Sequence, residues 1–422
     1  MRAHVVGAGL SGLSAALALA EAGAQVTLYE SGPAAGGRCR SYFDRVLGSR
    51  IDNGNHLLLS GNHAAMRFLD QTGALPSLGG PGEPLFPFLD LASDERWTVR
   101  PGSGRIPWWI LSRSRRVPGS RLIDYLALLA LRRAGAEATV AAVLGGGGEL
   151  YRRLLQPLAV AVLNTRPEVG LARLLGVVVE ETLMRGGAAC IPLFPRIGLS
   201  ETFVDPALAW LGARGGELRC GRRIASLGIE GGRVAALATP DGTVALAAED
   251  VAVLAVPAWV AADLLPGLTV PDAFEAILNV HFRLSATPGR AGFLGLIGGT
   301  AEWVFVKPGI VSVTISAASR LVDLPAEAVT ALVWPEVRRA LALPEPMPPA
   351  RVVKEKRATF AATAAQERRR PPGRTPLANL ALAGDWTATG LPATIEGAIR
   401  SGRTAAGVLL EAAQCTSARC RR

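Results

Sequence analysis

The stretch His4-Val-Val-Gly-Ala-Gly-Leu-Ser-Gly-Leu13 decides how this chain folds. A short β-branched run leads into three glycines with the spacing GxGxxG, and an alanine- and leucine-rich helix is predicted over Leu13–Ala22. Gly7 permits a tight turn, Gly9 lets the backbone approach a pyrophosphate, and Gly12 lets the helix pack closely on the strand. The stretch therefore predicts a strand, a turn and a helix whose N-terminus faces phosphate charge.

A second strand and an acidic residue complete this unit. The strand is predicted over Gln25–Tyr29, and Glu30 follows it eighteen residues after Gly12. An acid at this place can accept hydrogen bonds from the ribose of an adenosine. Because strand, helix and acid all fall where a dinucleotide site needs them, the motif predicts such a site, with Ser11 in its turn.

Length and composition favour two intertwined domains and a well-packed globular protein. The chain has 422 residues, of which 49% are hydrophobic and 19% charged, a balance that excludes a disordered chain. The net charge is +10, and almost all of the basic residues are arginine. This excess would suit contact with anionic lipid head groups, but arginine-favouring codon usage explains it equally well. No nucleic-acid-binding module is visible, so nucleic acid is not expected as a partner.

The five cysteines favour a reducing compartment. They are odd in number, scattered and free of metal-ligand spacing, which argues against a disulfide framework and against a structural metal. The N-terminus has the arginine and the apolar run of a signal peptide, but the glycine motif and Glu30 give that stretch another role. No uncharged apolar run has the length of a transmembrane helix. A cytoplasmic location is therefore expected.

A second glycine pair follows within Ser31–Arg38. Gly36 and Gly37 allow the backbone to press close to a bound group, and Arg38 can face a phosphate as a bidentate donor. Ser31, directly after the acid, is assigned to the same cofactor site.

A polar turn comes next, Asp52-Asn53-Gly54-Asn55-His56, and it runs into the apolar residues 57–59. On the residues alone, a turn with a structurally satisfied histidine is the favoured interpretation. Taken together, however, the motifs resemble the FAD-containing amine oxidase and phytoene desaturase superfamily, with its GxGxxG start, its acid and its downstream Gly-Gly-Arg. The polar turn resembles more closely the squalene-associated branch, the hydroxysqualene dehydroxylases of bacterial hopanoid pathways. That branch usually carries Gln where this chain has Asn55, a departure that is compatible with the turn. In this resemblance Asn53, Gly54 and Asn55 are assigned to the cofactor site.

The last informative stretch, residues 379–402, closely resembles the FAD signature at the C-terminal end of the same superfamily. An apolar strand delivers Gly384 and Asp385, where the acid could bind the ribityl hydroxyls of a flavin. A helix is predicted to begin at Pro392, and its free N–H groups would support negative charge on a reduced flavin ring. The remaining residues assigned to this site are Ala393, Thr394 and Ile395. The pairing of this motif with the first one favours FAD over NAD, which the first motif alone cannot separate.

The resemblance implies an α/β fold: a Rossmann-like FAD-binding domain of the glutathione-reductase type, with an interleaved α+β substrate domain and a helical insertion. We assign residues 1–75, 195–265 and 371–422 to the FAD-binding domain, and residues 76–194 and 266–370 to the substrate-binding domain. In the resembling family, the residue at the position of Ile224 lies beside the adenine.

The second part of the substrate domain is predicted to be an antiparallel sheet. Strand-like runs at 277–284, 303–306 and 310–316 alternate there with a helix near 326–341. His281 and Lys307 are its chemically interesting residues, and a structural role is favoured for each. Lys307 precedes Pro308-Gly309, which suggests a turn rather than the buried flavin-side lysine of amine oxidases.

The region between residues 76 and 195 combines tryptophans, arginines and leucines. Trp108-Trp109 is followed by the basic run Arg113–Arg116, and a leucine-rich helix is predicted over Leu122–Arg133. This composition is what an interfacial membrane element needs. A helical cap packed on its own protein, with solvated arginines, explains it equally well. Peripheral contact with the inner face of the cell membrane is therefore one of two open interpretations.

The chemistry that the resemblance implies is a reduction. Reduced FAD would give a hydride to the carbinol carbon of hydroxysqualene, a long-chain isoprenoid, releasing water and leaving squalene. A proton donor is needed because hydroxide is a poor leaving group. His56 is the candidate acid, with Asp52 as its partner, because their motif distinguishes this branch. The sequence does not indicate which donor supplies electrons to FAD.

Three other functions compete with this one. A carotenoid-type desaturase uses the same FAD motifs in the opposite redox direction. An amine oxidase is disfavoured, because four tyrosines leave little for an aromatic cage around an amine. From a different class, the chain could be a flavin- or lipid-binding partner without chemistry of its own.

Overall fold

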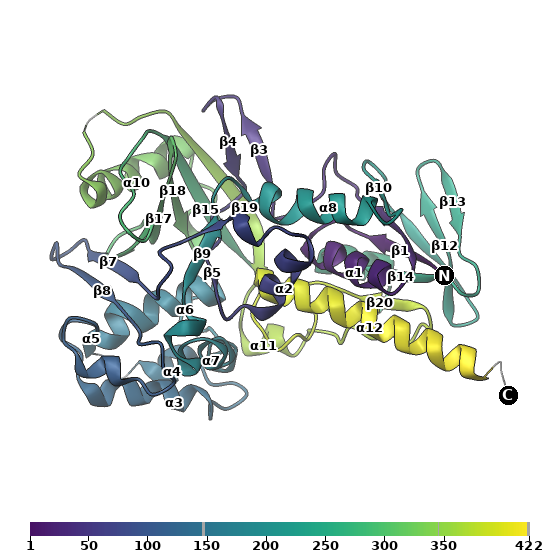
Figure 1. The fold of residues 1–422 in the computed structure, drawn as a ribbon, viewed down its shortest axis with the longest axis horizontal. Helices are drawn as coiled ribbons and strands as arrows, with labels where there is room; N and C mark the ends of the chain where they lie inside the picture. The colour runs from purple at the N-terminus through teal and green to yellow at the C-terminus, as the bar shows by residue number, and fades with distance from the viewer. Residues whose placement is uncertain (146–147, 345, 420–422) are drawn as a thin grey trace.

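The computed structural model describes residues 1–145, 148–344 and 346–419, with side chains described up to residue 414 (Figure 1). A parallel sheet and its helices lie towards the two termini, and a second sheet with a layer of helices forms the other end of the molecule (Figure 1).

The first sheet has five strands, all of them parallel. Their order is β10 (Glu217–Arg219), β2 (Gln25–Tyr29), β1 (Arg2–Val6), β14 (Val251–Leu254) and β20 (Leu380–Leu382). Every residue of β14 is buried, and β1 is exposed only at its first residue. Burial on both faces is what parallel strands between two layers require, and it explains their continuous apolar runs.

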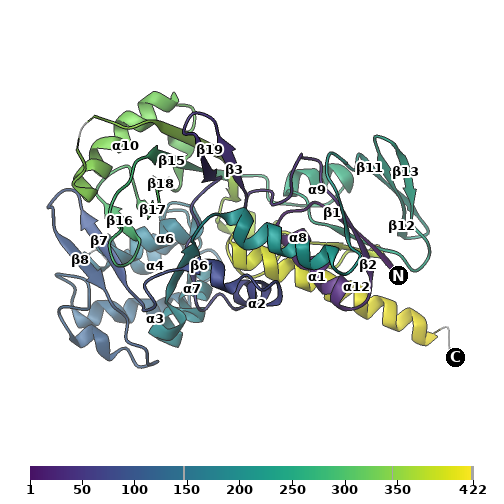
Figure 2. The same cartoon turned by 45° about the horizontal axis from the view of Figure 1, so that its top comes forward.

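Helices and a small meander cover the two faces of this sheet. One face packs against α1 (Leu10–Glu21), α8 (Asp205–Gly212) and α12 (Ile395–Arg419) (Figure 2). The other packs against β11 (Ser226–Glu230), β12 (Arg233–Thr239), β13 (Gly242–Ala245) and α9 (Ala258–Leu264). The first helix begins three residues earlier than predicted, because the carbonyl of Gly9 already accepts a helical hydrogen bond from the N–H of Leu13 at 2.9 Å.

The second sheet has seven strands, and all its pairs are antiparallel except β16 with β7. The order is β19 (Ala350–Phe360), β15 (Phe274–Arg283), β18 (Ile310–Ile315), β17 (Trp303–Lys307), β16 (Phe293–Ile297), β7 (Phe86–Asp90) and β8 (Arg96–Val99). The predicted strands and helix of this part are confirmed, and α10 (Ala326–Leu341) packs on the face that carries the valines of β17 and β18. The opposite face carries polar and aromatic side chains, and it takes part in the site described below.

The helical insertion lies at the end of the molecule away from both termini (Figure 1). Its elements are η2 (Trp108–Leu111), η3 (Leu122–Leu126), α3 (Ala127–Leu131), α4 (Val140–Leu144), α5 (Gly148–Leu150), η4 (Tyr151–Leu155), α6 (Gln156–Leu163), α7 (Ala172–Glu181), η5 (Leu183–Arg185) and η6 (Gly187–Ala189). The prediction of one α-helix over 122–133 is wrong: five residues form a 3-10 helix, and the α-helical part ends before Arg132. The segment from Glu149 to Leu163 is helical throughout, with a π-helical turn inside it.

Short elements connect these parts. They are the β3 (Ser41–Asp44) and β4 (Ser49–Asp52) hairpin, β5 (Leu58–Leu59), α2 (His63–Gln71), η1 (Leu75–Ser77), β6 (Leu78–Gly79), β9 (Pro192–Pro195), η7 (Ser200–Val204), η8 (Ala318–Arg320) and α11 (Ala364–Glu367). The small sheet β5-β9-β6 crosses the domain limits placed at 75/76 and 194/195. Those limits stay predictions.

Three properties bear on the expectations drawn from composition. Among the described side chains, Cys39 and Cys190 are buried free thiols and Cys220 is an exposed one, and burial raises the pKa of Cys190 to about 12. Within the described ranges, no group of three or more His, Cys, Asp or Glu side chains is arranged to hold a metal ion. No helix of the described chain is long and apolar enough to cross a membrane.

Candidate functional site

The N-terminal glycine turn lies at the carboxyl end of β1. Gly7 has a φ of +101°, which favours glycine, and its N–H donates to the carbonyl of Tyr29 at 2.7 Å. A Cβ on Gly12 would collide with the carbonyl oxygen of Gly7, so this residue must be glycine for the helix to pack. A Cβ on Gly9, in contrast, would have no heavy atom within 4 Å. The backbone at Gly9 therefore faces open space, where a bound group can approach it. Ser11 lies in the first turn of α1 and is buried.

Glu30 ties the loop after β2 to this turn. One carboxylate oxygen accepts the N–H of Ala8 at 3.1 Å, and the other accepts the N–H of Gly32 at 2.8 Å and the hydroxyl of Ser31 at 3.3 Å. The acid thus stands at the carboxyl edge of the parallel sheet, as the sequence predicts. Ile224, assigned to the adenine end, is buried ahead of β11.

The second glycine pair lies directly against the first turn. The N–H of Gly36 donates to the carbonyl of Ala8 at 2.8 Å, and Gly36 forms an isolated bridge with Gly9. Gly36 and Gly37 both have positive φ, +109° and +58°. A Cβ on Gly37 would lie 3.4 Å from the Cα of Gly9. Two glycine segments therefore form one continuous backbone surface.

Arg38 and Asp385 join the two ends of the chain. A guanidinium nitrogen of Arg38 lies 2.7 Å from a carboxylate oxygen of Asp385, and another donates to the carbonyl of Ala358. The sequence predicts that Arg38 faces a phosphate and that Asp385 binds ribityl hydroxyls. In the chain by itself, these two side chains bind each other. Asp385 is buried, and its second carboxylate oxygen takes no part in this pair.

The C-terminal motif places a helix N-terminus at the same edge. Gly384 donates its N–H to the hydroxyl of Ser401 at 2.8 Å, which fixes the strand end against α12. The prediction that the helix starts at Pro392 is wrong, because α12 begins at Ile395. Thr394 precedes it, and its hydroxyl accepts the N–H of Gly397 at 3.0 Å. Pro392 and Ala393 form the approach to the helix, whose first N–H groups lack helical partners.

Glu396 and Arg400 hold this helix in place, and the sequence interpretation missed both. The Glu396 carboxylate accepts the N–H groups of Ala64 and Ala65, at 3.0 and 2.8 Å, at the start of α2. It also accepts from Arg400 at 2.8 Å, and Arg400 reaches Glu181 of the insertion at 2.9 Å. An acid in the first turn of a helix is a common capping signal, so its contact with a second helix could not be predicted from the pattern alone.

The prediction that Asp52 pairs with His56 is wrong. The Asp52 carboxylate accepts from the hydroxyl of Ser41 at 2.6 Å, from the N–H of Leu199 at 2.9 Å and from the ammonium of Lys307 at 2.7 Å. Burial opposes ionisation of Asp52, but the Lys307 charge and these hydrogen bonds outweigh it, and the pKa of Asp52 lies below its usual value. A turn follows Lys307, as predicted, and its side chain is largely buried in a structural ion pair with Asp52 that the sequence does not reveal.

The rest of the polar turn is fastened to the second sheet. The amide of Asn53 donates to the carbonyl of Arg38 at 3.3 Å and to Glu355 at 3.2 Å, and the amide of Asn55 donates to the hydroxyl of Thr314 at 3.1 Å. A Cβ on Gly54 would lie 3.0 Å from the side chain of Asn279. These side chains, assigned to the cofactor site, therefore position the turn between the two sheets.

His56 is partly exposed at the end of this turn, and its ring makes no hydrogen bond to Asp52. Desolvation lowers the pKa of His56 to about 4, and the nearby Asp52 charge compensates only in part. The imidazole is therefore neutral at neutral pH in the chain by itself. His281, in contrast, is buried and pairs through Nδ1 with the hydroxyl of Ser312 at 2.7 Å, in agreement with the structural role predicted for it.

An aromatic wall adjoins the turn, and the sequence interpretation did not find it. Leu57, next to His56, packs against a buried cluster that includes Phe293 and Phe305, and three further aromatic side chains pack against the same cluster, Phe86, Phe194 and Trp303. Ring centroids within this cluster are 6.0 to 6.3 Å apart, in tilted and edge-to-face arrangements. Its members come from strands far apart in the sequence, so periodicity within one strand could not reveal it.

A half-buried acid directly before β17 has a raised pKa. Glu302 precedes Trp303, and its carboxylate accepts the N–H of Ser316 at 2.8 Å. Burial raises the pKa of Glu302 to about 7, although the contacts with Ser316 oppose that shift.

These observations test whether the chain can hold FAD. The open space at Gly9, the adjoining Gly36–Gly37 backbone, the acid at the end of β2 and the N-terminus of α12 all lie at the carboxyl edge of one parallel sheet. Open α/β sheets bind their ligands at that edge. The residues present therefore fit a flavin dinucleotide, which the glycine backbone and the N-terminus of α12 would hold.

The chain belongs to the flavin-containing amine oxidoreductase family, whose model matches residues 10–287 and 305–410. Within it, the relatives that match over nearly the whole length are hydroxysqualene dehydroxylases. The protein of that name from Zymomonas mobilis is 46% identical over 407 residues, which is 96% of this chain and 98% of the relative. The one from Rhodopseudomonas palustris is 48% identical over 410 residues, 97% of this chain and 98% of the relative.

Other matches are partial or concern the fold alone. A probable zeta-carotene desaturase from Synechococcus elongatus is 38% identical over 78 residues, 18% of this chain and 16% of that protein. The solved structure of an oxidoreductase from Methanosarcina mazei superposes with a TM-score of 0.70 at 15% identity, covering 97% of this chain and 100% of that one. The chain is thus an FAD-dependent oxidoreductase with the fold predicted from its sequence.

Proposed function

We propose that this protein reduces hydroxysqualene to squalene with FAD. The observation that carries the proposal is the identity of 46 to 48% with hydroxysqualene dehydroxylases over at least 96% of the chain. The match to a carotenoid desaturase covers 18% of the chain, so the oxidative alternative has much weaker support.

The residues at the edge of the parallel sheet would hold the cofactor. Gly9 and the Gly36–Gly37 backbone would bind the pyrophosphate, and Glu30 would accept hydrogen bonds from the ribose. Asp385 has one carboxylate oxygen outside its pair with Arg38 and would bind the ribityl chain. When bound and reduced, FAD supplies a hydride equivalent.

The reaction breaks the carbinol C–O bond and forms a C–H bond, and a proton joins the hydroxyl group, which leaves as water. The chain must therefore deliver one proton for each hydride that reaches carbon. His56 is the residue of the polar turn that can deliver it, from a ring nitrogen, because Asp52 is ionised and engaged by Lys307. With a pKa of about 4, the imidazole lacks its second ring proton at neutral pH, so it can donate that proton only when a negatively charged group bound beside the turn raises the pKa.

The aromatic wall beside Leu57 would receive the isoprenoid. Its rings exclude water from the reacting carbon and offer their π faces to positive charge that develops as the C–O bond breaks. Glu302, directly before Trp303 in the chain, has a pKa of about 7, so part of its population holds a proton at neutral pH.

Anaerobic single turnover tests the proposal. The holoprotein is reduced with dithionite, freed of excess reductant and mixed with hydroxysqualene; oxidation of the flavin absorbance and formation of squalene, measured by mass spectrometry, are the expected results. Flavin reduction by phytoene in the oxidised protein would instead indicate a desaturase. No response to either compound would indicate a flavin- or lipid-binding partner without chemistry.

A histidine pair tests the proton donor. We expect His56→Ala to retain FAD and to lose at least about a hundredfold in turnover, the usual scale of general acid catalysis. His63→Ala is the matched control, because His63 is exposed at the start of α2. Turnover at the wild-type rate in the His56 variant would exclude His56 as the acid and direct attention to Glu302.

A further inference from the structure

One face of the helical insertion exposes large apolar side chains. Of the sixteen large hydrophobic residues exposed in the described part of the chain, seven lie between residues 106 and 129. Trp108 is 68% exposed and Ile123 61% exposed. Single exposed apolar residues are ordinary on a protein surface, but seven within 24 residues of the chain indicate a contact site. The members used below are Ile106, Trp108, Leu111, Ile123, Leu126 and Leu129, and we call them the apolar face.

The same segment packs inward through other residues, so the apolar face is not a misplaced core. Tyr125 and Leu131 are buried, and Trp109 meets the ring of Tyr125 edge to face at 5.7 Å. The 3-10 helix η3 and helix α3 are thus apolar both towards the protein and towards solvent. The interpretation as a cap packed on its own protein explains the inner side and leaves the outer side unexplained.

The segment that carries the apolar face is rich in positive charge. Residues 105–133 contain seven arginines and one acid, Asp124. Among the described residues of this segment, Arg121 pairs with Asp124 and Arg132 with Glu180, and the other five arginines form no ion pair. Arg105 and Arg113 are exposed beside the apolar side chains. Arginines, with their long apolar stems, near the apolar face suit the head-group region of an anionic membrane.

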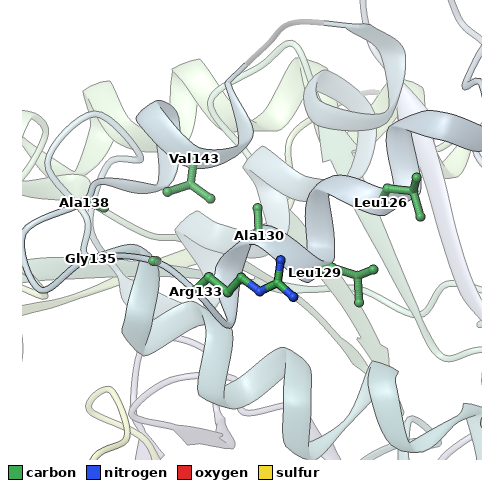
Figure 3. Close-up of a pocket in the computed structure, with 8 residues that line it drawn as sticks. Leu126, Leu129, Ala130, Arg133, Gly135, Ala138 and Val143 are labelled. Atoms are coloured by element: carbon green, nitrogen blue, oxygen red, sulfur yellow. The ribbon is translucent and has the colours of Figure 1, made fainter.

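A hollow of about 550 Å³ opens in the same face (Figure 3). Leu126 and Leu129 belong both to the apolar face and to the lining of the hollow, and Val143 of α4 lines another part of it. Arg133 also lines the hollow, and Figure 3 shows its long side chain beside Ala130 with the guanidinium group towards Leu129. The hollow therefore combines an apolar wall with one cation, which suits the chain and the phosphate of a lipid.

We propose that this face of the insertion docks on a bilayer that contains anionic phospholipid. A second copy of the chain is a poorer occupant, because a two-fold contact through this face would bring the unpaired arginines of both copies together. The inference rests on the exposed surface and its charge, and it stands or falls independently of the substrate proposed above.

Vesicle binding of the FAD-loaded protein tests the proposal without measuring turnover. The probes are sedimenting vesicles of phosphatidylcholine alone and vesicles in which part of it is replaced by phosphatidylglycerol. We expect binding that rises with the phosphatidylglycerol content and falls with added salt, because each arginine near the surface contributes roughly fivefold to binding. Absence of binding to the anionic vesicles would overturn the proposal.

Two pairs of substitutions locate the contact. Trp108→Ser with Ile123→Ser should lower vesicle binding at least about tenfold, because two inserted apolar side chains are lost. Arg105→Gln with Arg113→Gln should lower it to a similar extent and reduce its salt dependence. Ile229→Ser is the control, since Ile229 is 45% exposed on β11 in the small meander, far from the insertion (Figure 2). FAD absorbance and the melting temperature verify that each variant is folded.

Other outcomes overturn the proposal in distinguishable ways. An equal loss of vesicle binding with Ile229→Ser would indicate nonspecific adsorption rather than a docking face. The wild type could instead self-associate without binding vesicles. If that self-association disappears in the Trp108 and Ile123 variant, the face binds a second copy of the chain. Binding to an acidic protein but not to anionic vesicles would assign it to a protein partner.

Discussion

Replacement of Gly9 by alanine should weaken FAD binding and leave the folding of the apoprotein intact. Gly9 has φ −75° and ψ 179°, an extended conformation that alanine adopts without strain. The added methyl group would have no heavy atom within 4 Å. Nothing in the protein itself therefore opposes the substitution, and any loss reports on what binds in that space.

The expected magnitudes differ between folding and binding. The free energy of unfolding of the apoprotein should rise by no more than about 1 kcal/mol, because alanine restricts the conformations of the unfolded chain. The dissociation constant for FAD should rise at least about tenfold, equivalent to about 1.4 kcal/mol, because the methyl group occupies the surface that a pyrophosphate must approach.

The assay titrates apoprotein with FAD by the quenching of flavin fluorescence and unfolds the apoprotein in guanidinium chloride. Gly12→Ala is the contrasting variant: its Cβ would collide with the carbonyl oxygen of Gly7, so it should destabilise the fold itself. Gly212→Ala, at the end of α8 with no neighbour within 4 Å, should have the same small effect on the free energy of unfolding and should leave the affinity for FAD unchanged. Wild-type affinity for FAD in the Gly9 variant would refute the placement of the cofactor on this turn.

Two further predictions concern buried charges of the second sheet. Lys307→Met should lower the free energy of unfolding, measured by urea denaturation, by about 3 kcal/mol, because it leaves the Asp52 carboxylate buried without its partner 2.7 Å away. The double variant with Asp52→Asn should recover most of that loss. A smaller effect of the single variant than of the double one would contradict the pairing. For Glu302, whose pKa of about 7 lies above the unfolded value, the folded state binds the extra proton. Its contribution to stability is complete below about pH 4.5 and is lost as the pH rises to about 7, by about 3 kcal/mol. Glu302→Gln should remove this fall, and an unchanged pH dependence of unfolding in the variant would show that the carboxyl is not the group responsible.

Much of the fold could be predicted because its signals are local. The GxGxxG turn, the strand before it and the acid after the second strand lie within thirty residues, and each follows from backbone geometry near a phosphate. Three of the seven strands of the second sheet, β15, β17 and β18, and helix α10 are predicted from the sequence within a few residues. The helix boundaries in 122–133 and at Pro392 were wrong, because a 3-10 start and a late helix start depend on what the segment packs against.

The catalytic side of the site could not be predicted in the same way. Asp52 and His56 are four residues apart and look like partners, yet Asp52 is held by Lys307 from a strand 255 residues further along the chain. The aromatic wall gathers rings from β7, β9, β16 and β17. Which acid meets which base across two sheets is a property of their packing.

By itself, the sequence determined the class of protein, because cofactor binding depends on short motifs in which glycine, acid and helix start stand at fixed spacing. Only the tertiary structure decided that Arg38 meets Asp385, that Lys307 neutralises Asp52, and that Trp108 and Ile123 face solvent. The physical reason is that charge pairing and exposure depend on distances through space between segments far apart in the chain, and local spacing does not contain those distances.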